Sequence, residues 1–101
     1  MSSRLNLQKE LEELIGSRNV YFQPPPSLKM KFPCIVYSRV RINTDFADNY
    51  PYKLDDVYQI TYIDTDPDSE IPKKLAQRKQ CVFERDYKAN ELYHNVFRQV
   101  Y

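Results

Sequence analysis

The chain has 101 residues, of which 42% are hydrophobic and 29% are charged, and its 15 basic residues nearly balance 14 acidic ones. This length supports one domain with an ordinary core, and the near-neutral charge gives no long-range field that would recruit nucleic acid or an anionic membrane. No apolar stretch approaches the roughly 20 residues of a membrane span, and a single glycine, Gly16, excludes glycine-rich phosphate-binding loops.

The N-terminal segment predicts an amphipathic helix from Ser3 to Ile15. Its apolar residues recur at helical spacing and polar residues fill the remaining face. The apolar stripe consists of Leu7, Leu11, Leu14 and Ile15. Ser2 or Ser3 can cap the start, and Gly16 can take the left-handed conformation that ends a helix. The first 20 residues lack the apolar run of a secretory signal, so we expect the chain to stay in the cytoplasm in which it is made.

The middle of the chain predicts two strands joined by an aromatic loop. A short extended piece (residues 20–22) and a stiff proline triplet (residues 24–26) lead into the first strand, residues 34–42. Residues 43–53 mix turn formers with aromatic side chains, which predicts a loop that contacts another surface. Residues 57–64 predict the second strand because β-branched and aromatic residues alternate there.

The last third predicts a short helix followed by two strands. Ser69 or Asp68 can cap a helix near residues 70–78. Residues 81–87 and the alternating segment 92–101 then predict a pair of strands, and we expect the fold to finish with the last of them. We expect an α+β fold: one small domain over residues 1–101, with a mostly antiparallel four-stranded sheet and both helices packed on one face.

Two patterns could carry metal chemistry. Asp64, Asp66 and Asp68 copy the opening of a calcium loop, but Ser69 stands at its glycine position and Leu75 at its final ligand position. His94 is the only histidine, and a metal-dependent hydrolase built around it would lack a second histidine, paired cysteine ligands or a nucleophile. We therefore expect no enzyme activity, no catalytic residue, no metal and no cofactor.

The tyrosines and two arginines favour binding. Nine tyrosines suit protein interfaces, because the ring is apolar and the hydroxyl is polar. Arg39 and Arg41, predicted to share a strand face with Tyr37, could instead bind single-stranded nucleic acid by stacking and phosphate contact. A merely solvated strand face is the third reading. Cys34 and Cys81 lie in apolar strand patterns and are expected to be free buried thiols.

The ordered set of segments resembles the tail terminator, or tail-completion, proteins of long-tailed bacteriophages, also called tail-to-head joining proteins. The resemblance covers nearly the whole chain: an N-terminal helix, a Phe-Pro-x-Ile-Val-Tyr strand entry (residues 32–37), a strand ending in Asp64, a short helix, and a closing strand with Tyr93, His94 and Phe97. The chain is shorter than most members, and Pro72 lies in its short middle helix. These departures keep open a neighbouring class of head-to-tail connector or minor capsid protein.

The resemblance implies a structural virion protein at the head–tail interface, assembled in the host bacterial cytoplasm. A ring, typically a homo-hexamer, caps the tail tube, stops its polymerisation and offers the head-to-tail joining surface. The implied partners are further copies of the chain, the major tail tube protein and a head completion or connector protein. No membrane is involved, and nucleic acid enters only as the genome that passes through the ring lumen.

Within that role we assign the following contacts. The predicted loop with Phe46, Tyr50 and Tyr52 would contact the tail or a neighbouring copy. A sheet edge ending at Tyr101 would accept an added strand. Arg39 and Arg41 would face the lumen or an acidic neighbour.

Overall fold

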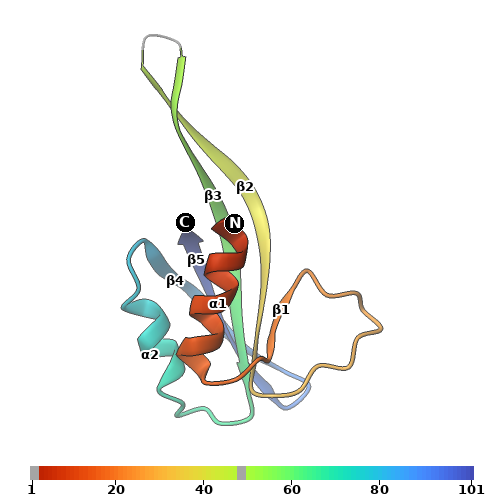
Figure 1. Cartoon of the computed structure of the whole chain (residues 1–101). Helices are drawn as coiled ribbons and strands as arrows, with labels where there is room; N and C mark the ends of the chain where they lie inside the picture. The colour runs from red at the N-terminus through yellow and green to blue at the C-terminus, as the bar shows by residue number, and fades with distance from the viewer. Residues whose placement is uncertain (1–2, 48–49) are drawn as a thin grey trace.

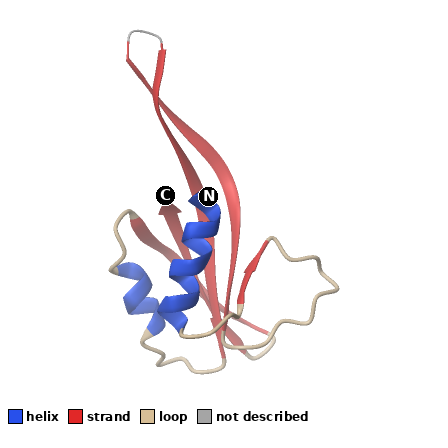
Figure 2. Ribbon diagram, viewed as in Figure 1, coloured by secondary structure: helices blue, strands red, loops and turns tan. Residues whose placement is uncertain are grey.

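A mixed sheet with two helices on one face forms the protein in this computed structural model, which describes residues 3–47 and 50–101 and the side chains of residues 4–40 and 56–101 (Figures 1 and 2). Along the chain the elements are α1 (Ser3–Ile15), β1 (Val20–Phe22), β2 (Cys34–Ala47), β3 (Tyr50–Asp64), α2 (Ile71–Ala76), β4 (Cys81–Ala89) and β5 (Leu92–Val100). The predicted α+β class with two helices is confirmed.

The sheet has five strands within the described residues, in the order β1-β2-β3-β5-β4. β1 runs parallel to β2, with Val20 beside Ile35, and the other neighbouring pairs are antiparallel. The prediction of four strands is therefore wrong by one short strand. Three residues are too few for alternation to distinguish a strand from an extended connection, and only the pairing with β2 defines β1.

Capping residues, glycine and proline account for the ends of the two helices. α1 has the predicted bounds, and Gly16 follows it with a φ of 71° while its N–H donates to the carbonyl of Glu12. α2 is shorter than predicted: Pro72 stands in its first turn and Glu70 is the N-cap residue. Ser69, one of the two predicted caps, still accepts the N–H of Ile71 through its hydroxyl at 3.3 Å.

The core lies between the helices and one face of the sheet. Leu7 and Leu11 of α1 are fully buried, as is Leu75 of α2. They pack with alternating residues of the sheet, because every second side chain of a strand points to the same face. These sheet residues are Val20, Ile35, Tyr37, Tyr58, Ile60, Tyr62, Cys81 and Phe97. Cys34, Val57, Ile63 and Val96 are also buried but lie outside this cluster, on the opposite face of the sheet.

Strands β2 and β3 continue as a two-stranded arm beyond the rest of the sheet. Their pairing runs from Cys34 opposite Ile63 to Ala47 opposite Tyr50, whereas β5 pairs with β3 only from Val57 onward. We call residues 41–47 and 50–56 the arm; Figure 1 shows this hairpin rising past the end of β5. The molecule measures 50 × 25 × 23 Å along its principal axes. The predicted loop over residues 43–53 is therefore wrong, since this backbone is mostly strand.

Candidate functional site

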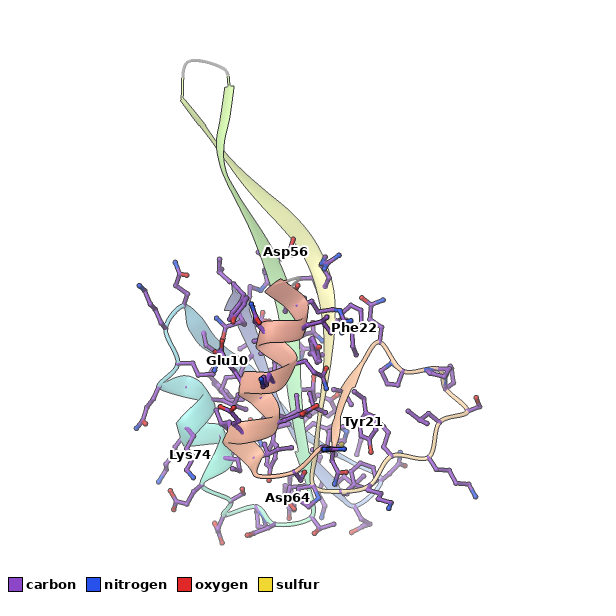
Figure 3. All side chains as sticks on the ribbon, in the orientation of Figure 1. Glu10, Tyr21, Phe22, Asp56, Asp64 and Lys74 are labelled. Atoms are coloured by element: carbon purple, nitrogen blue, oxygen red, sulfur yellow. The ribbon has the colours of Figure 1, made fainter. Side chains whose placement is uncertain are left out.

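The root of the arm is held by a polar cluster centred on Asp56. Its carboxylate lies 3.5 Å from Nε of Arg39 and accepts the hydroxyl of Tyr58 at 3.2 Å. Arg39 also donates to the Tyr58 hydroxyl at 3.3 Å, and the backbone N–H of Tyr101 donates to the Asp56 carbonyl at 3.0 Å. Figure 3 shows Asp56 at the level where the hairpin leaves the body. The structure thus brings together Arg39 and Tyr101, which we had assigned to different contacts.

The other predicted contact residues can be placed only by their backbone. Phe46 lies in β2, and Tyr50 and Tyr52 lie in β3, so all three belong to the arm. A register shift pairs Arg39 with Tyr58 and Arg41 with Val57. The bulge interrupts the strict alternation from which we predicted that the two arginines share a face. The side chains of Phe46, Tyr50, Tyr52 and Arg41 lie outside the described residues.

Tyr37 is part of the core rather than of a binding platform. Its side chain is 1% exposed, and its hydroxyl donates to Oε1 of Gln8 at 2.5 Å and accepts from Arg4 at 3.3 Å. Burial raises the pKa of Tyr37 above its ordinary value. A buried ring cannot stack on a nucleic-acid base, so the predicted surface of Tyr37, Arg39 and Arg41 lacks its aromatic member.

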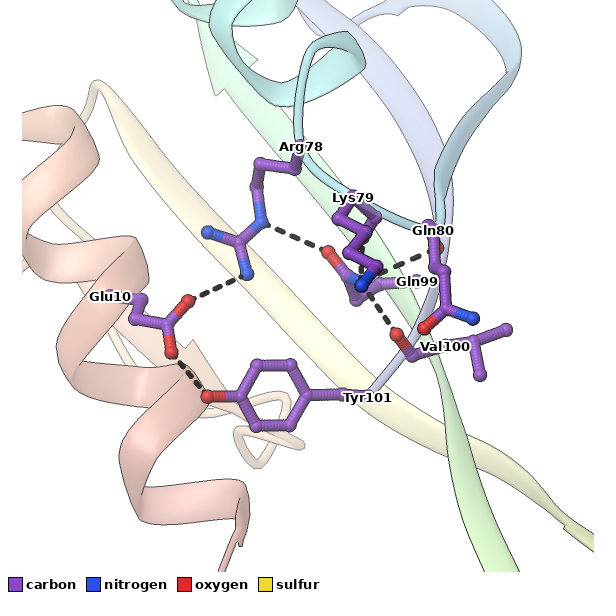
Figure 4. Close-up of polar contacts among 7 residues, drawn as sticks. All are labelled: Glu10, Arg78, Lys79, Gln80, Gln99, Val100 and Tyr101. Atoms are coloured by element: carbon purple, nitrogen blue, oxygen red, sulfur yellow. Dashed lines mark hydrogen bonds and ion pairs between the residues drawn. The ribbon is translucent and has the colours of Figure 1, made fainter.

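A second polar cluster joins α1, the turn after α2 and β5 (Figure 4). Arg78 donates through Nε to Oε1 of Gln99 at 2.9 Å, and its guanidinium lies 3.0 Å from Glu10. The hydroxyl of Tyr101 donates to the other oxygen of Glu10, and this hydrogen bond, with burial, raises the pKa of Tyr101. The seven residues drawn in Figure 4 line a cavity of about 340 Å³.

This second cluster stabilises the fold, because its hydrogen bonds connect neighbouring elements. Gln99 is 1% exposed, and its amide donates to the carbonyls of Lys79, Gln80 and Val100 at 3.0, 3.3 and 2.7 Å. Arg78 and Glu10 therefore satisfy each other, and the Gln99 amide satisfies the backbone carbonyls around it. Sequence reasoning missed this role of Gln99; the available signal was a polar residue at a core position between Phe97 and Tyr101.

The free edges of the sheet differ from the predicted one. β5 pairs with β3 on one side and with β4 on the other, so a sheet edge ending at Tyr101 is wrong. β4 is an outer strand, and three of its large side chains are well exposed: Val82 at 64%, Phe83 at 47% and Tyr87 at 46%. An outer strand presents one row of unpaired backbone groups. This edge was missed because the order of strands in a sheet cannot be read from their order in the chain.

The two candidate metal patterns serve local structure. Asp64 accepts the Tyr62 hydroxyl at 2.6 Å and the N–H of Asp66 at 3.1 Å, which makes it a turn former. His94 stacks on Tyr87 with ring centroids 4.6 Å apart, and its Nδ1 lies 3.1 Å from the Leu92 carbonyl. Among the described residues, no three His, Cys, Asp or Glu side chains are grouped so that they could hold a metal ion.

Helices long and apolar enough to cross a membrane are absent from the described part of the chain. Comparison with known proteins finds no matching family model, no matching curated protein and no matching solved structure.

Proposed function

We propose that this protein is a structural virion protein that caps the end of a phage tail tube as a ring. In this role it stops tube polymerisation and provides the surface that joins tail to head. The order of its helices and strands, which resembles the tail terminator proteins, supports the proposal. It is not an enzyme in this role, and its partners are further copies of itself, the tube protein and a head completion or connector protein.

The arm is the observation that carries the proposal. Beyond Val57 the hairpin has two strands, and no third strand of the described chain pairs with it there. A two-stranded ribbon is marginally stable by itself in water and needs a further surface to pack against. An assembly of identical subunits supplies such a surface from the neighbouring copy or from the tube.

The arm and the β4 edge also provide the two different surfaces that a ring requires. A ring repeats one heterologous contact until it closes, so each copy must present two unlike patches. β4 stands at one side of the sheet, separated from the β2–β3 hairpin by β5. The two patches can therefore be occupied at the same time by different neighbours.

Another head-to-tail connector or a minor capsid protein is the alternative within the same class, since it would use the same kind of surfaces. A small nucleic-acid-binding protein is disfavoured by the burial of Tyr37. Catalysis around His94 is disfavoured because the ring stacks on Tyr87 and Nδ1 faces a backbone carbonyl.

The test is an assembly experiment with tail tubes reconstituted from the tube protein of a long-tailed phage. Solution mass by light scattering and electron microscopy of tube ends would be recorded with and without the tubes. We expect a ring at tube ends and an end to tube growth. A protein that leaves tube length and tube ends unchanged would contradict the terminator role and favour the connector alternative.

A double variant locates the contact. Tyr50→Ala with Tyr52→Ala should abolish capping while the circular dichroism spectrum and the melting temperature change little. Leu28→Ala with Phe32→Ala, which truncates two exposed side chains on the β1–β2 connection, is the matched control and should still cap. Unfolding of the tyrosine variant would make these residues part of a folded core and remove the arm contact.

A further inference from the structure

β4 leaves one side of the described sheet open. It is nine residues long, is an outer strand and pairs there with β5 alone. Residues 82–88 are all exposed, and Val82, Phe83 and Tyr87 are exposed by 64%, 47% and 46%. A strand of this kind presents a row of unpaired backbone donors and acceptors, to which another strand can add.

A bulge places two neighbouring charged side chains of β4 on the same face of the sheet. The pairing of β4 with β5 shifts register around Glu84, which is left without a partner residue in β5. Arg85 pairs with Val96, and the Glu84 carboxylate lies 3.4 Å from the guanidinium of Arg98. Both contact residues in β5 alternate with Phe97, which points to the helices, so Glu84 and Arg85 face away from the helices.

This arrangement makes β4 complementary to a second copy of itself. Two antiparallel β4 strands related by a two-fold axis between Glu84 and Arg85 place each Glu84 opposite the Arg85 of the other copy. Val82 then lies opposite Tyr87 of the other copy, which joins two exposed apolar side chains. Their partner residues in β5 lie an even number of positions apart, so both side chains point to the same face of the sheet.

Charge allows this pairing and disfavours a shifted one. β4 has two acidic and two basic residues, so two copies of the strand carry no net charge that would repel them. A two-fold axis at Arg85 itself would set Glu84 opposite Asp86, and like charges directly opposite each other are destabilising. Charges and bulges discourage unspecific pairing of edge strands, and in β4 they leave one register in which opposite charges meet.

We propose that two copies of this protein pair through their β4 edges as an antiparallel two-fold dimer, in which both five-stranded sheets form one continuous sheet. The contact is isologous, because both copies use the same strand. The inference goes beyond the proposed function, since it describes the free protein. The ring proposed above also uses the β4 edge, so the dimer has to open before a ring can close. The open edge is thus covered while the protein is away from a tube.

The experiment uses charge reversal in the full chain and sedimentation velocity over a range of concentrations. Across the two-fold axis, Glu84→Arg sets arginine opposite arginine, and Arg85→Glu sets glutamate opposite glutamate. Each variant alone should dimerise at least about tenfold more weakly than the natural chain. The control variants, Glu13→Arg in α1 and Lys29→Glu in the β1–β2 connection, make matching charge changes at exposed positions and should dimerise normally.

A mixture of the two β4 variants tests the two-fold geometry. With Glu84→Arg in one copy and Arg85→Glu in the other, opposite charges again meet at both positions across the axis. The mixture should therefore dimerise about as tightly as the natural chain. A heterologous contact, in which β4 meets a different surface, gives no such recovery. Circular dichroism of each variant alone verifies that it is folded, because Glu84→Arg also removes the ion pair with Arg98.

Amide hydrogen exchange of the natural chain tests the backbone pairing without a variant. The amides of residues 82–88 should become more protected as the protein concentration rises, whereas those of the β1–β2 connection should not change. The dimer would be overturned by a natural chain that stays monomeric at millimolar concentration, by single variants that dimerise normally, or by folded variants whose mixture stays monomeric.

The dimer and the proposed function can fail separately. A chain that dimerises and leaves tube ends unchanged would retain the dimer and reject the terminator role. A chain that caps tubes and is monomeric without them would retain the terminator role and reject the dimer.

Discussion

The Nε–H of Arg78 donates to Oε1 of Gln99 across 2.9 Å and so fastens the turn after α2 to the interior strand β5. The side chain of Arg78 is only 16% exposed, and its guanidinium also reaches Glu10 of α1. A charged group in such a position needs its partners, because an unpaired buried polar group costs more than a hydrogen bond gains. Three separate elements are held together by these two side chains.

Gln99→Leu should destabilise the fold by about 2–4 kcal/mol, because it removes the amide that Nε of Arg78 and the carbonyls of Lys79 and Val100 use as a partner. The measurement is urea unfolding monitored by circular dichroism. Gln77→Leu, at an exposed position after α2, is the control and should stay within about 0.5 kcal/mol of the natural chain. Equal stabilities for the two variants would show that the Gln99 hydrogen bonds contribute nothing net.

Leu11→Ala should cost about 2–5 kcal/mol in unfolding free energy, since this side chain is fully buried between α1 and the sheet and its loss leaves a cavity. Leu28→Ala makes the same chemical change at an exposed position of the β1–β2 connection and should cost less than about 0.5 kcal/mol. Thermal and urea unfolding of both variants measure the difference. A cost at Leu28 as large as at Leu11 would place the core elsewhere.

Glu91→Gly should stabilise the protein by about 0.5–1 kcal/mol. Asn90 and Glu91 form the two-residue turn between β4 and β5, with φ angles of 52° and 64°, where the Cβ atom itself is strained and glycine, which has none, is not. The same substitution in α1, Glu13→Gly, should destabilise by about 1 kcal/mol because glycine weakens a helix interior. Loss of stability at position 91 would contradict the turn geometry.

Stability should fall at alkaline pH in a way that depends on Cys34. Burial, and secondarily the Asp64 carboxylate, raises the pKa of this thiol from 9.0 to about 11. The unfolded chain loses the proton first, so the stabilising contribution is complete below pH 9 and is lost as the pH rises through about 11. Cys34→Ala should flatten the decline of unfolding free energy over this interval, and an unchanged decline would assign it to other groups.

Much of the fold follows from local patterns. The stripe of Leu7 and Leu11 and the glycine after Ile15 predicted α1 correctly, and alternation predicted the inner parts of β2, β3, β4 and β5. β1 was not predicted as a strand because three residues are too few to show alternation. The strands of the arm were not predicted because their turn-forming residues and Pro51 are typical of a loop. A strand at the edge of a sheet tolerates proline, whereas an inner strand does not.

The candidate site was less predictable than the fold, since it depends on which strands are neighbours. Charge and chain position single out Arg39 and Tyr101, but the contact that both make with Asp56 depends on the register of β2, β3 and β5. The strand pattern predicts Tyr37 on the same face as Arg39 and Arg41, whereas α1 covers its ring in the structure. The apolar side chains of β4 are exposed because β4 is an outer strand, and the position of a strand in the sheet cannot be predicted from the sequence of that strand.

The position of β5 also bears on how the protein is made. It follows β4 in the chain but lies between β3 and β4 in the sheet. Within the described fold, β4 pairs with β5, so β4 has no place in the sheet until residues 92–100 have left the ribosome. During translation α1, β2 and β3 can gather first, whereas β4 can join the sheet only after β5 has paired with β3. The exposed outer edge of β4 is therefore formed later than the β2–β3 hairpin.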